Sequence, residues 1–103
     1  MNSIFKALSD PTRRRVLQLL RERPMTAGEL AGHFSIAKPT LSAHFAVLRE
    51  ADLVEPVKQA NTITYHLKLS VLEDALLSFA ESLSIGTGAR DEVSDRAAKG
   101  AKS

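Results

Sequence analysis

The sequence contains no cysteine among its 103 residues. A chain without thiols forms no disulfide, binds no metal through thiolates and senses no redox change through cysteine. It also lacks an apolar run of the roughly 20 residues that a membrane-spanning helix needs, and its N-terminus lacks the pattern of a signal peptide. These absences exclude several classes of protein, and we expect a cytoplasmic protein.

The chain also lacks a large excess of either positive or negative charge. Fourteen Lys and Arg residues are offset by twelve Asp and Glu residues, so the formal net charge is only +2. This balance does not by itself indicate a polyanionic partner, and the positions of the charges must decide. The length, 44% hydrophobic residues and 25% charged residues predict one globular domain.

Residues that would make an enzyme or a metal site are dispersed. The five glycines form no phosphate-binding loop, and no nucleophile–base pair or catalytic carboxylate pair is evident. The three histidines fall on three separate predicted elements: His33, His44 and His66. Glu73, Asp74 and Glu81 have no histidine beside them, which favours a solvated helix face over a metal site. We therefore expect no catalysis, no metal and no cofactor.

The most informative stretch runs from Thr26 to Leu53 and predicts two short helices joined by a turn. Thr26 and Glu29 form a T-x-x-E capping box, which predicts a helix from there to about His33. Phe34-Ser35-Ile36 supplies the turn. A second helix is predicted from about Ala37, with Pro39 in its first turn, where no amide hydrogen is needed.

The second of these helices has two different faces. Leu41, Phe45 and Leu48 recur at the spacing of one apolar stripe. Short hydroxyl and methyl side chains lie on the outer side, and such side chains let a helix approach base edges in the DNA major groove. This arrangement is typical of a helix-turn-helix unit with the second helix as reader. An ordinary helix pair with a solvated face is the alternative.

Two helical segments precede this unit. Residues 3–8 predict a short apolar turn or helix, and Asp10-Pro11 predicts the cap and first residue of a longer helix that ends near Pro24. Arg13 falls on the buried stripe of that helix with Val16, Leu17 and Leu20, so we interpret it as structural. Arg14 and Arg21 lie on the outer stripe, either contacting phosphate or solvated.

After the reader helix the apolar period changes to two. Val54–Lys58 and Thr62–Lys68 predict a β-hairpin around Gln59-Ala60-Asn61, with Pro56 restricting the first strand to an edge. Alternation predicts that Ile63 packs inward together with Tyr65 and Leu67. A hairpin at this place is the wing of a winged helix, and its tip, Lys58 to Thr62, would contact DNA. A purely stabilising hairpin is the alternative.

The last predicted helix begins at a second capping box, Ser70 and Glu73, and runs to about Ile85. Its apolar residues cover about 180°, more than the ~100° stripe that one core needs. We therefore expect a homodimer that uses this helix and the N-terminal segment. The predicted interface comprises Ile4, Phe5, Leu8, Leu72, Leu76, Phe79, Ala80 and Leu83. Residues 86–103 are polar, and we expect them to be a disordered tail after a winged-helix domain of residues 1–85.

The runs ALSDPTRRRVLQLL, MTAGELAGHF and AKPTLSAHFAVLREADLV resemble the ArsR-type winged helix-turn-helix repressors, over residues 3 to 85. Within that family the chain is most similar to the SdpR branch of autorepressors, which lack metal ligands. The resemblance implies a mainly α fold with four helices, a small hairpin and a fifth helix, and a homodimeric repressor on inverted-repeat operator DNA. Reader contacts would fall on Lys38, Thr40, Ser42, Ala43 and Arg49. Phosphate and wing contacts would fall on Thr26, Ala27, Lys58, Gln59, Asn61 and Thr62.

The chain departs from the family pattern at three places. Ala37 replaces a capping Ser, which costs about 1 kcal/mol of helix stability. Ala43 replaces a His that would read bases, and Ala60-Asn61 replaces a common Gly and Arg at the wing tip. The last two changes affect operator sequence and affinity. A metal- or ligand-responsive sensor, or a winged helix that binds protein instead of DNA, are the alternative functions.

Overall fold

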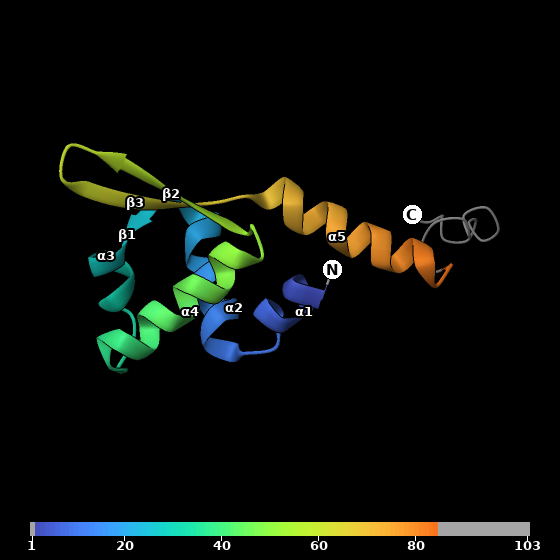
Figure 1. Cartoon of the computed structure of the whole chain (residues 1–103), viewed down its shortest axis with the longest axis horizontal. Coiled ribbons are helices and arrows are strands. Elements are labelled where there is room, and N and C mark those ends of the chain that lie inside the picture. Colours follow the sequence, from blue (N-terminus) through green and yellow to red (C-terminus); the bar gives the residue numbers. More distant parts are fainter. Residues whose placement is uncertain (1, 85–103) are drawn as a thin grey trace. The chain divides into compact units, whose positions relative to one another are not determined.

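The computed structural model describes residues 2–84 and divides into two compact units, the first ending at Leu72 and the second beginning at Glu73. The predicted tail from Gly86 on, and the predicted helix end at Ile85, lie outside the described residues. The elements of the first unit (Figure 1) are α1 (Asn2–Leu8), α2 (Pro11–Glu22), β1 (Met25–Thr26), α3 (Ala27–Ala31), α4 (Lys38–Glu50), β2 (Val54–Gln59) and β3 (Thr62–Leu67). Helix α5 (Leu69–Ser82) begins in the first unit and lies mostly in the second.

Helix α2 begins as the sequence predicts. The Asp10 side chain accepts hydrogen bonds from the backbone amides of Thr12 (2.8 Å) and Arg13 (3.2 Å), and Pro11 is the first helical residue. Partial burial raises the pKa of Asp10, but the two backbone amides, together with the neighbouring Arg13 guanidinium, outweigh it and lower the pKa. The carboxylate is therefore held in its charged form at the start of α2, where the helix dipole favours it.

The sheet has three antiparallel strands in the order β1-β3-β2, one more than the sequence predicts. Strand β1 has two residues, too few to show an alternating pattern, and it exists because Met25 and Thr26 pair with Tyr65 and Thr64. Strand β2 lies at an edge, as Pro56 predicts. The fold class, mainly α with a small antiparallel sheet, is confirmed.

The core of the first unit is formed by apolar residues from α1 to α4, from β1 and β2, and from the short segment after α4. Leu30, Leu48 and Leu53 are completely buried, and Val16 is nearly so. The other buried apolar residues are Ile4, Ala7, Leu17, Leu19, Leu20, Met25, Leu41, Phe45, Ala51 and Val54. Because Ile4 is 6% exposed, it belongs to the core of its own chain, and its predicted place on a surface for a second copy is wrong.

A joint of three residues, Ala51 to Leu53, connects α4 to β2. The Leu53 amide donates to Leu48 O (3.0 Å) and the Asp52 amide to Arg49 O (2.9 Å), which closes the end of the helix. Asp52 adopts a φ of 62°, and its carboxylate accepts from Lys68 Nζ at 2.8 Å. This hydrogen bond raises the pKa of Lys68. The Lys68 amide also donates to Leu53 O (2.8 Å), so both ends of the hairpin are tied to the joint.

Helix α5 starts at Leu69, two residues earlier than a capping box with Ser70 as its N-cap predicts. Ser70 lies inside its first turn, so Ser70 is not the N-cap, and Lys68 O accepts from the amides of Val71 and Leu72. In the second unit, Leu76, Leu77, Phe79 and Leu83 are 40–55% exposed. Among the described residues, no helix is both long and apolar enough to cross a membrane.

Candidate nucleic-acid interface

Helix α4 is fixed to the first unit through one face. Leu41, Phe45 and Leu48 are buried there as predicted, and the Phe45 ring packs against Tyr65 of β3 with ring centroids 5.1 Å apart. The helix begins at Lys38 with Ala37 as its N-cap, and no side chain caps it, as the Ala37 departure predicts. The orientation of α4 therefore depends on packing more than on its own start.

The outer face of α4 presents the predicted reader residues to solvent. We call the reading face the five exposed side chains Lys38, Thr40, Ser42, Ala43 and Arg49. Their hydroxyl, methyl and cationic groups are of the kinds that contact base edges and phosphates in a major groove. The structure thus exposes all five predicted reader residues on one helix, with Lys38, Ser42 and Arg49 on one side and Thr40 and Ala43 on the far flank.

The start of α3 has the capping box that the sequence predicts. Thr26 N donates to Glu29 Oε1 (2.9 Å), and Glu29 N donates to Thr26 Oγ1 (3.1 Å). The first of these bonds is the main cause of the lowered pKa of Glu29, and Arg23 lowers it further. Since the Thr26 amide is engaged, Thr26 has only its hydroxyl to offer a phosphate, whereas the exposed Ala27 has its amide in the first turn.

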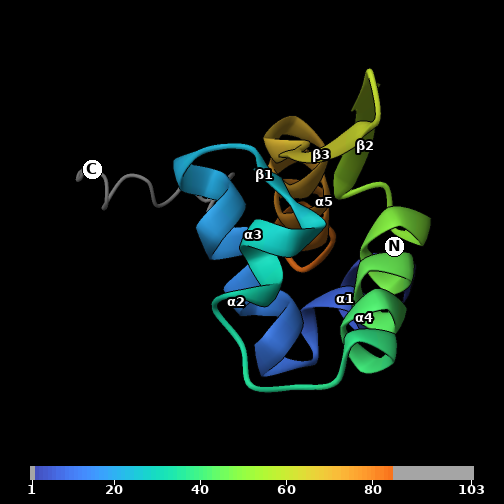
Figure 2. The ribbon, with the colours of Figure 1, turned by 90° about the vertical axis from the view of Figure 1, so that its left-hand side faces the viewer.

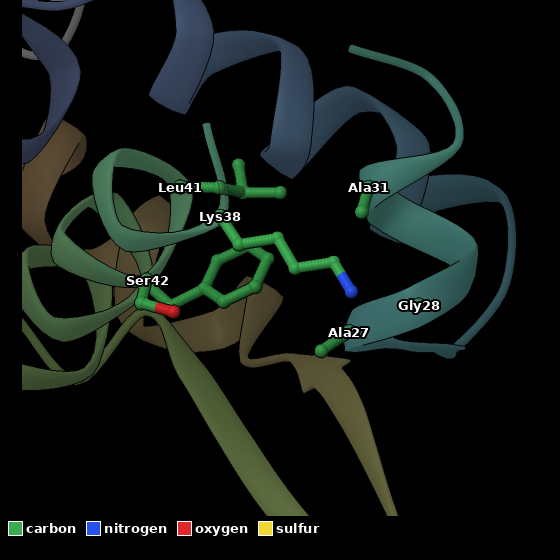
Figure 3. Close-up of a pocket in the computed structure, with 7 residues that line it drawn as sticks. Ala27, Gly28, Ala31, Lys38, Leu41 and Ser42 are labelled. Atoms are coloured by element: carbon green, nitrogen blue, oxygen red, sulfur yellow. The ribbon is translucent and has the colours of Figure 1, made fainter. Parts of the chain in front are cut away.

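A shallow hollow of about 160 Å³ lies between α3 and the first half of α4. Figure 3 shows Lys38 extended across this hollow, with its ammonium directed toward the first turn of α3. The lining residues are Ala27, Gly28, Ala31, Lys38, Leu41, Ser42 and Phe45. Gly28 and Ala31 were not predicted from the sequence, although small residues next to Ala27 are the signal for a surface that leaves room for the Lys38 side chain.

The hairpin of β2 and β3 extends past the short strand β1 (Figure 1), and its predicted contact residues are exposed. These are Lys58, Gln59, Asn61 and Thr62. Ala60 in the turn has a φ of 55°, a conformation that glycine adopts without cost. Ile63, which pairs with Lys58, is 45% exposed, so the prediction that it packs inward is wrong. It lies one residue beyond the part of β3 that β1 covers.

The start of α4, α3 and the hairpin turn lie on the same side of the first unit. In Figure 1 the start of α4, α3 and the hairpin turn are all at the left. Figure 2 looks onto that side and shows α3 and α4 next to each other, with the hairpin projecting beside them. One surface therefore offers a helix, a helix N-terminus and a hairpin to a single ligand.

The contacts of Arg13 confirm the prediction that this residue is structural. Its guanidinium donates to Ala7 O, Lys6 O and Ser9 Oγ and contacts His44 Nδ1 at 3.0 Å. His44 is half-buried, and its Nδ1 contacts Arg13. Arg14, on the outer stripe, donates to Leu8 O at 2.7 Å.

The remaining predicted interface residues differ in exposure. In the first unit, Phe5, Leu8 and Leu72 are half-buried. In the second unit, Leu76, Phe79 and Leu83 are exposed and Ala80 is half-buried. Within residues 2–84, no group of three or more His, Asp or Glu residues could hold a metal ion.

Comparisons with known proteins agree with this geometry. A helix-turn-helix domain profile matches residues 8–57. The transcriptional repressor SdpR of Bacillus subtilis (strain 168) is 45% identical over 76 residues, 74% of this chain and 84% of that protein. The arsenical resistance operon repressor of Staphylococcus aureus is 36% identical over 76 residues, 74% of this chain and 73% of that protein.

Solved structures give the same result. An ArsR family transcriptional regulator matches with a TM-score of 0.73 and 33% identity, covering 82% of this chain and 92% of that one. These relatives are named as transcriptional regulators and not as enzymes. From its sequence, fold and relatives, the chain belongs to the ArsR-type winged helix-turn-helix family of transcriptional repressors.

Proposed function

We propose that this protein represses transcription as a homodimer that binds an inverted-repeat operator in its own promoter, without a metal. The observation that carries the proposal is the division of α4 into a buried apolar stripe and an exposed face of small, polar and cationic side chains. A solvated helix needs no such small residues, whereas a helix that enters a major groove does.

Each part of the surface has a role in the proposal. Lys38, Thr40, Ser42 and Ala43 read base edges, and Arg49 contacts phosphate. The first turn of α3, with Thr26 and Ala27, contacts the phosphate backbone, because amides at a helix N-terminus attract anions. Lys58, Gln59, Asn61 and Thr62 contact the flanking DNA through the wing.

The dimer is proposed to use the apolar residues of α1 and α5 that remain accessible, with residues 1–85 as one functional domain. The proposed interface residues are Phe5, Leu8, Leu72, Leu76, Phe79, Ala80 and Leu83. The exposure of large apolar side chains on α5 supports this assignment, since such surfaces mark association sites. Two copies would place their reader helices in successive major grooves about 34 Å apart. Such a repressor would act in the cytoplasm, where it meets the chromosome.

The experiment is fluorescence anisotropy of the protein on the DNA upstream of its own gene, titrated with salt and with chelator. We expect sequence-selective binding that weakens steeply with salt, because phosphate contacts release counterions, and that does not respond to chelator. A response to chelator would indicate metal sensing instead. Absence of selective binding to this and to genomic DNA would favour a protein-interaction module.

A matched pair of variants tests the reading face. Ser42→Asp should abolish operator binding while leaving the dimer intact, because it places a negative charge against the groove. Ser70→Asp makes the same change at an exposed position in the first turn of α5 and should retain binding. Operator affinity like that of the unmodified protein in Ser42→Asp would contradict the assignment of this face.

A further inference from the structure

One side chain, Arg13, joins three elements of the first unit. Its Nε donates to Ala7 O at 2.9 Å, and its Nη2 donates to Lys6 O at 2.8 Å and to Ser9 Oγ at 3.4 Å. Its Nη1 lies 3.0 Å from Nδ1 of His44 on α4. A residue of α2 therefore contacts both the end of α1 and the reader helix.

The contacts to α1 satisfy backbone groups that the helix leaves open. The last carbonyls of a helix have no partner inside it, and Arg13 donates to that of Ala7 while Arg14 donates to that of Leu8. Lys6 O accepts from Arg13 in addition to the amide and hydroxyl of Ser9. The planar guanidinium has donors pointing in several fixed directions, so it can bind these carbonyls and a ring nitrogen at once. A lysine has three donors on one nitrogen, so it cannot reach acceptors that Nε, Nη1 and Nη2 of Arg13 contact separately.

The contact to α4 falls at the boundary between its two faces. His44 is half-buried, between Ala43 of the reading face and Phe45 of the buried stripe. Because the guanidinium can only donate, His44 Nδ1 must accept, which leaves the ring proton on Nε2. Nε2 lies 3.9 Å from Asp10 Oδ2, so the ring is held between Arg13 and the cap of α2.

We propose that Arg13 is a positioning residue for DNA binding, which couples α1 to the rotation of the reader helix through His44. The proposal rests on the proposed function, in which α1 belongs to the dimer interface and α4 reads DNA. Buried apolar contacts fix the inner stripe of α4 without direction, whereas a hydrogen bond to a ring nitrogen fixes the rotation of the helix about its axis. Through this coupling, the rotation of α4 about its axis, and with it the direction of the reading face, depends on the position of α1.

The test uses two variants of His44. His44→Asn keeps an acceptor near the position of Nδ1, and His44→Leu removes it at similar size. We expect His44→Leu to weaken operator binding by about tenfold, the size of a typical coupling between two sites, while His44→Asn stays close to the unmodified protein. The slope of affinity against salt should stay unchanged, because neither variant loses a phosphate contact. Sedimentation should show the same dimer in all three proteins.

A double variant separates coupling from two independent effects. If Arg13 acts through His44, Arg13→Lys combined with His44→Leu should be no weaker than Arg13→Lys alone. Unchanged affinity in His44→Leu, equal losses in both His44 variants, or additive losses in the double variant would each overturn the proposal. If an Arg13 variant fails to fold, the His44 pair still decides.

A measurement without DNA keeps the inference distinguishable from the proposed function. In NMR spectra of the free protein, His44→Leu should shift the amide signals of residues 6–8 in α1, and His44→Asn should shift them much less. Signals in α1 that ignore both variants would overturn the coupling even where DNA binding is intact. Failure of the unmodified protein to bind any operator would instead overturn the proposed function and leave the NMR result to decide the coupling.

Discussion

Helices α4 and α5 are both amphipathic, but their exposed faces are opposite in character. The exposed side chains of α4 are small, polar or cationic, whereas α5 exposes Leu76, Leu77, Phe79 and Leu83. A polar exposed face can exchange its hydration for hydrogen bonds to base edges and phosphates, and an apolar one gains only by being covered. The comparison supports the proposal that α4 binds DNA and α5 binds a second copy of the chain.

The largest effect is expected from a charge on the exposed face of α5. Leu76→Lys should raise the dissociation constant of the dimer by about 100-fold, since it removes the burial of a leucine and adds a charge to desolvate. Sedimentation equilibrium across micromolar concentrations measures this. Ser78→Lys makes a similar change at an exposed polar position of the same helix and should have little effect. A Leu76→Lys protein that dimerises normally would break the comparison.

A smaller effect is expected at the start of α4. Ala37 already has the extended backbone of an N-cap, with φ −64° and ψ 144°, so Ala37→Ser can accept from the Thr40 amide. The free energy of unfolding should rise by about 1 kcal/mol in urea denaturation. Ala46→Ser, in the middle of the exposed face, should instead lower it by a few tenths of a kcal/mol. Equal responses of the two variants would show that α4 gains nothing from a cap.

The smallest effect concerns pH and the start of α3, which has the cap that α4 lacks. The pKa of Glu29 is lowered in the folded protein, mainly by the Thr26 amide, so its ionised form stabilises the fold above the ordinary glutamate pKa. That contribution is lost as the pH falls through the lowered pKa. The stability difference between the unmodified protein and Glu29→Gln, from urea denaturation, should therefore be larger at neutral pH than in acid. A difference independent of pH would contradict this assignment, and Glu22→Gln controls for the loss of a surface carboxylate.

Features set by neighbouring residues were predictable from the sequence. The Asp10 cap, the capping box at Thr26 and Glu29 and the apolar stripe of α4 each depend on residues within a few positions of one another. The same applies to Arg13, whose place on the helical wheel already indicated a packed stem. Because interactions between residues close in sequence determine these features, the sequence alone is enough to predict them.

Features that depend on distant partners were not predictable. Strand β1 forms only because β3 supplies partners about 40 residues later along the chain. Ile63 follows the inward pattern of its strand but lies near the hairpin turn, opposite Lys58, and is 45% exposed. Ile4 has an apolar side chain that would suit an interface, and only the packed structure shows that its own chain covers it. For the candidate site, the pattern gave the residues, and the structure added the hollow that Lys38 crosses.

The joint at Asp52 has a consequence for the length of each half-site in an operator. Only three residues separate the reader helix from the wing. Backbone hydrogen bonds and the Lys68–Asp52 contact hold these residues, so they fix the position of the wing relative to the helix. Inserting one base pair into DNA moves the downstream base pairs by about 3.4 Å and rotates them by roughly 35°. In the proposed complex, the protein backbone therefore sets the length of each half-site, and only the spacing between the two half-sites depends on how the two copies associate.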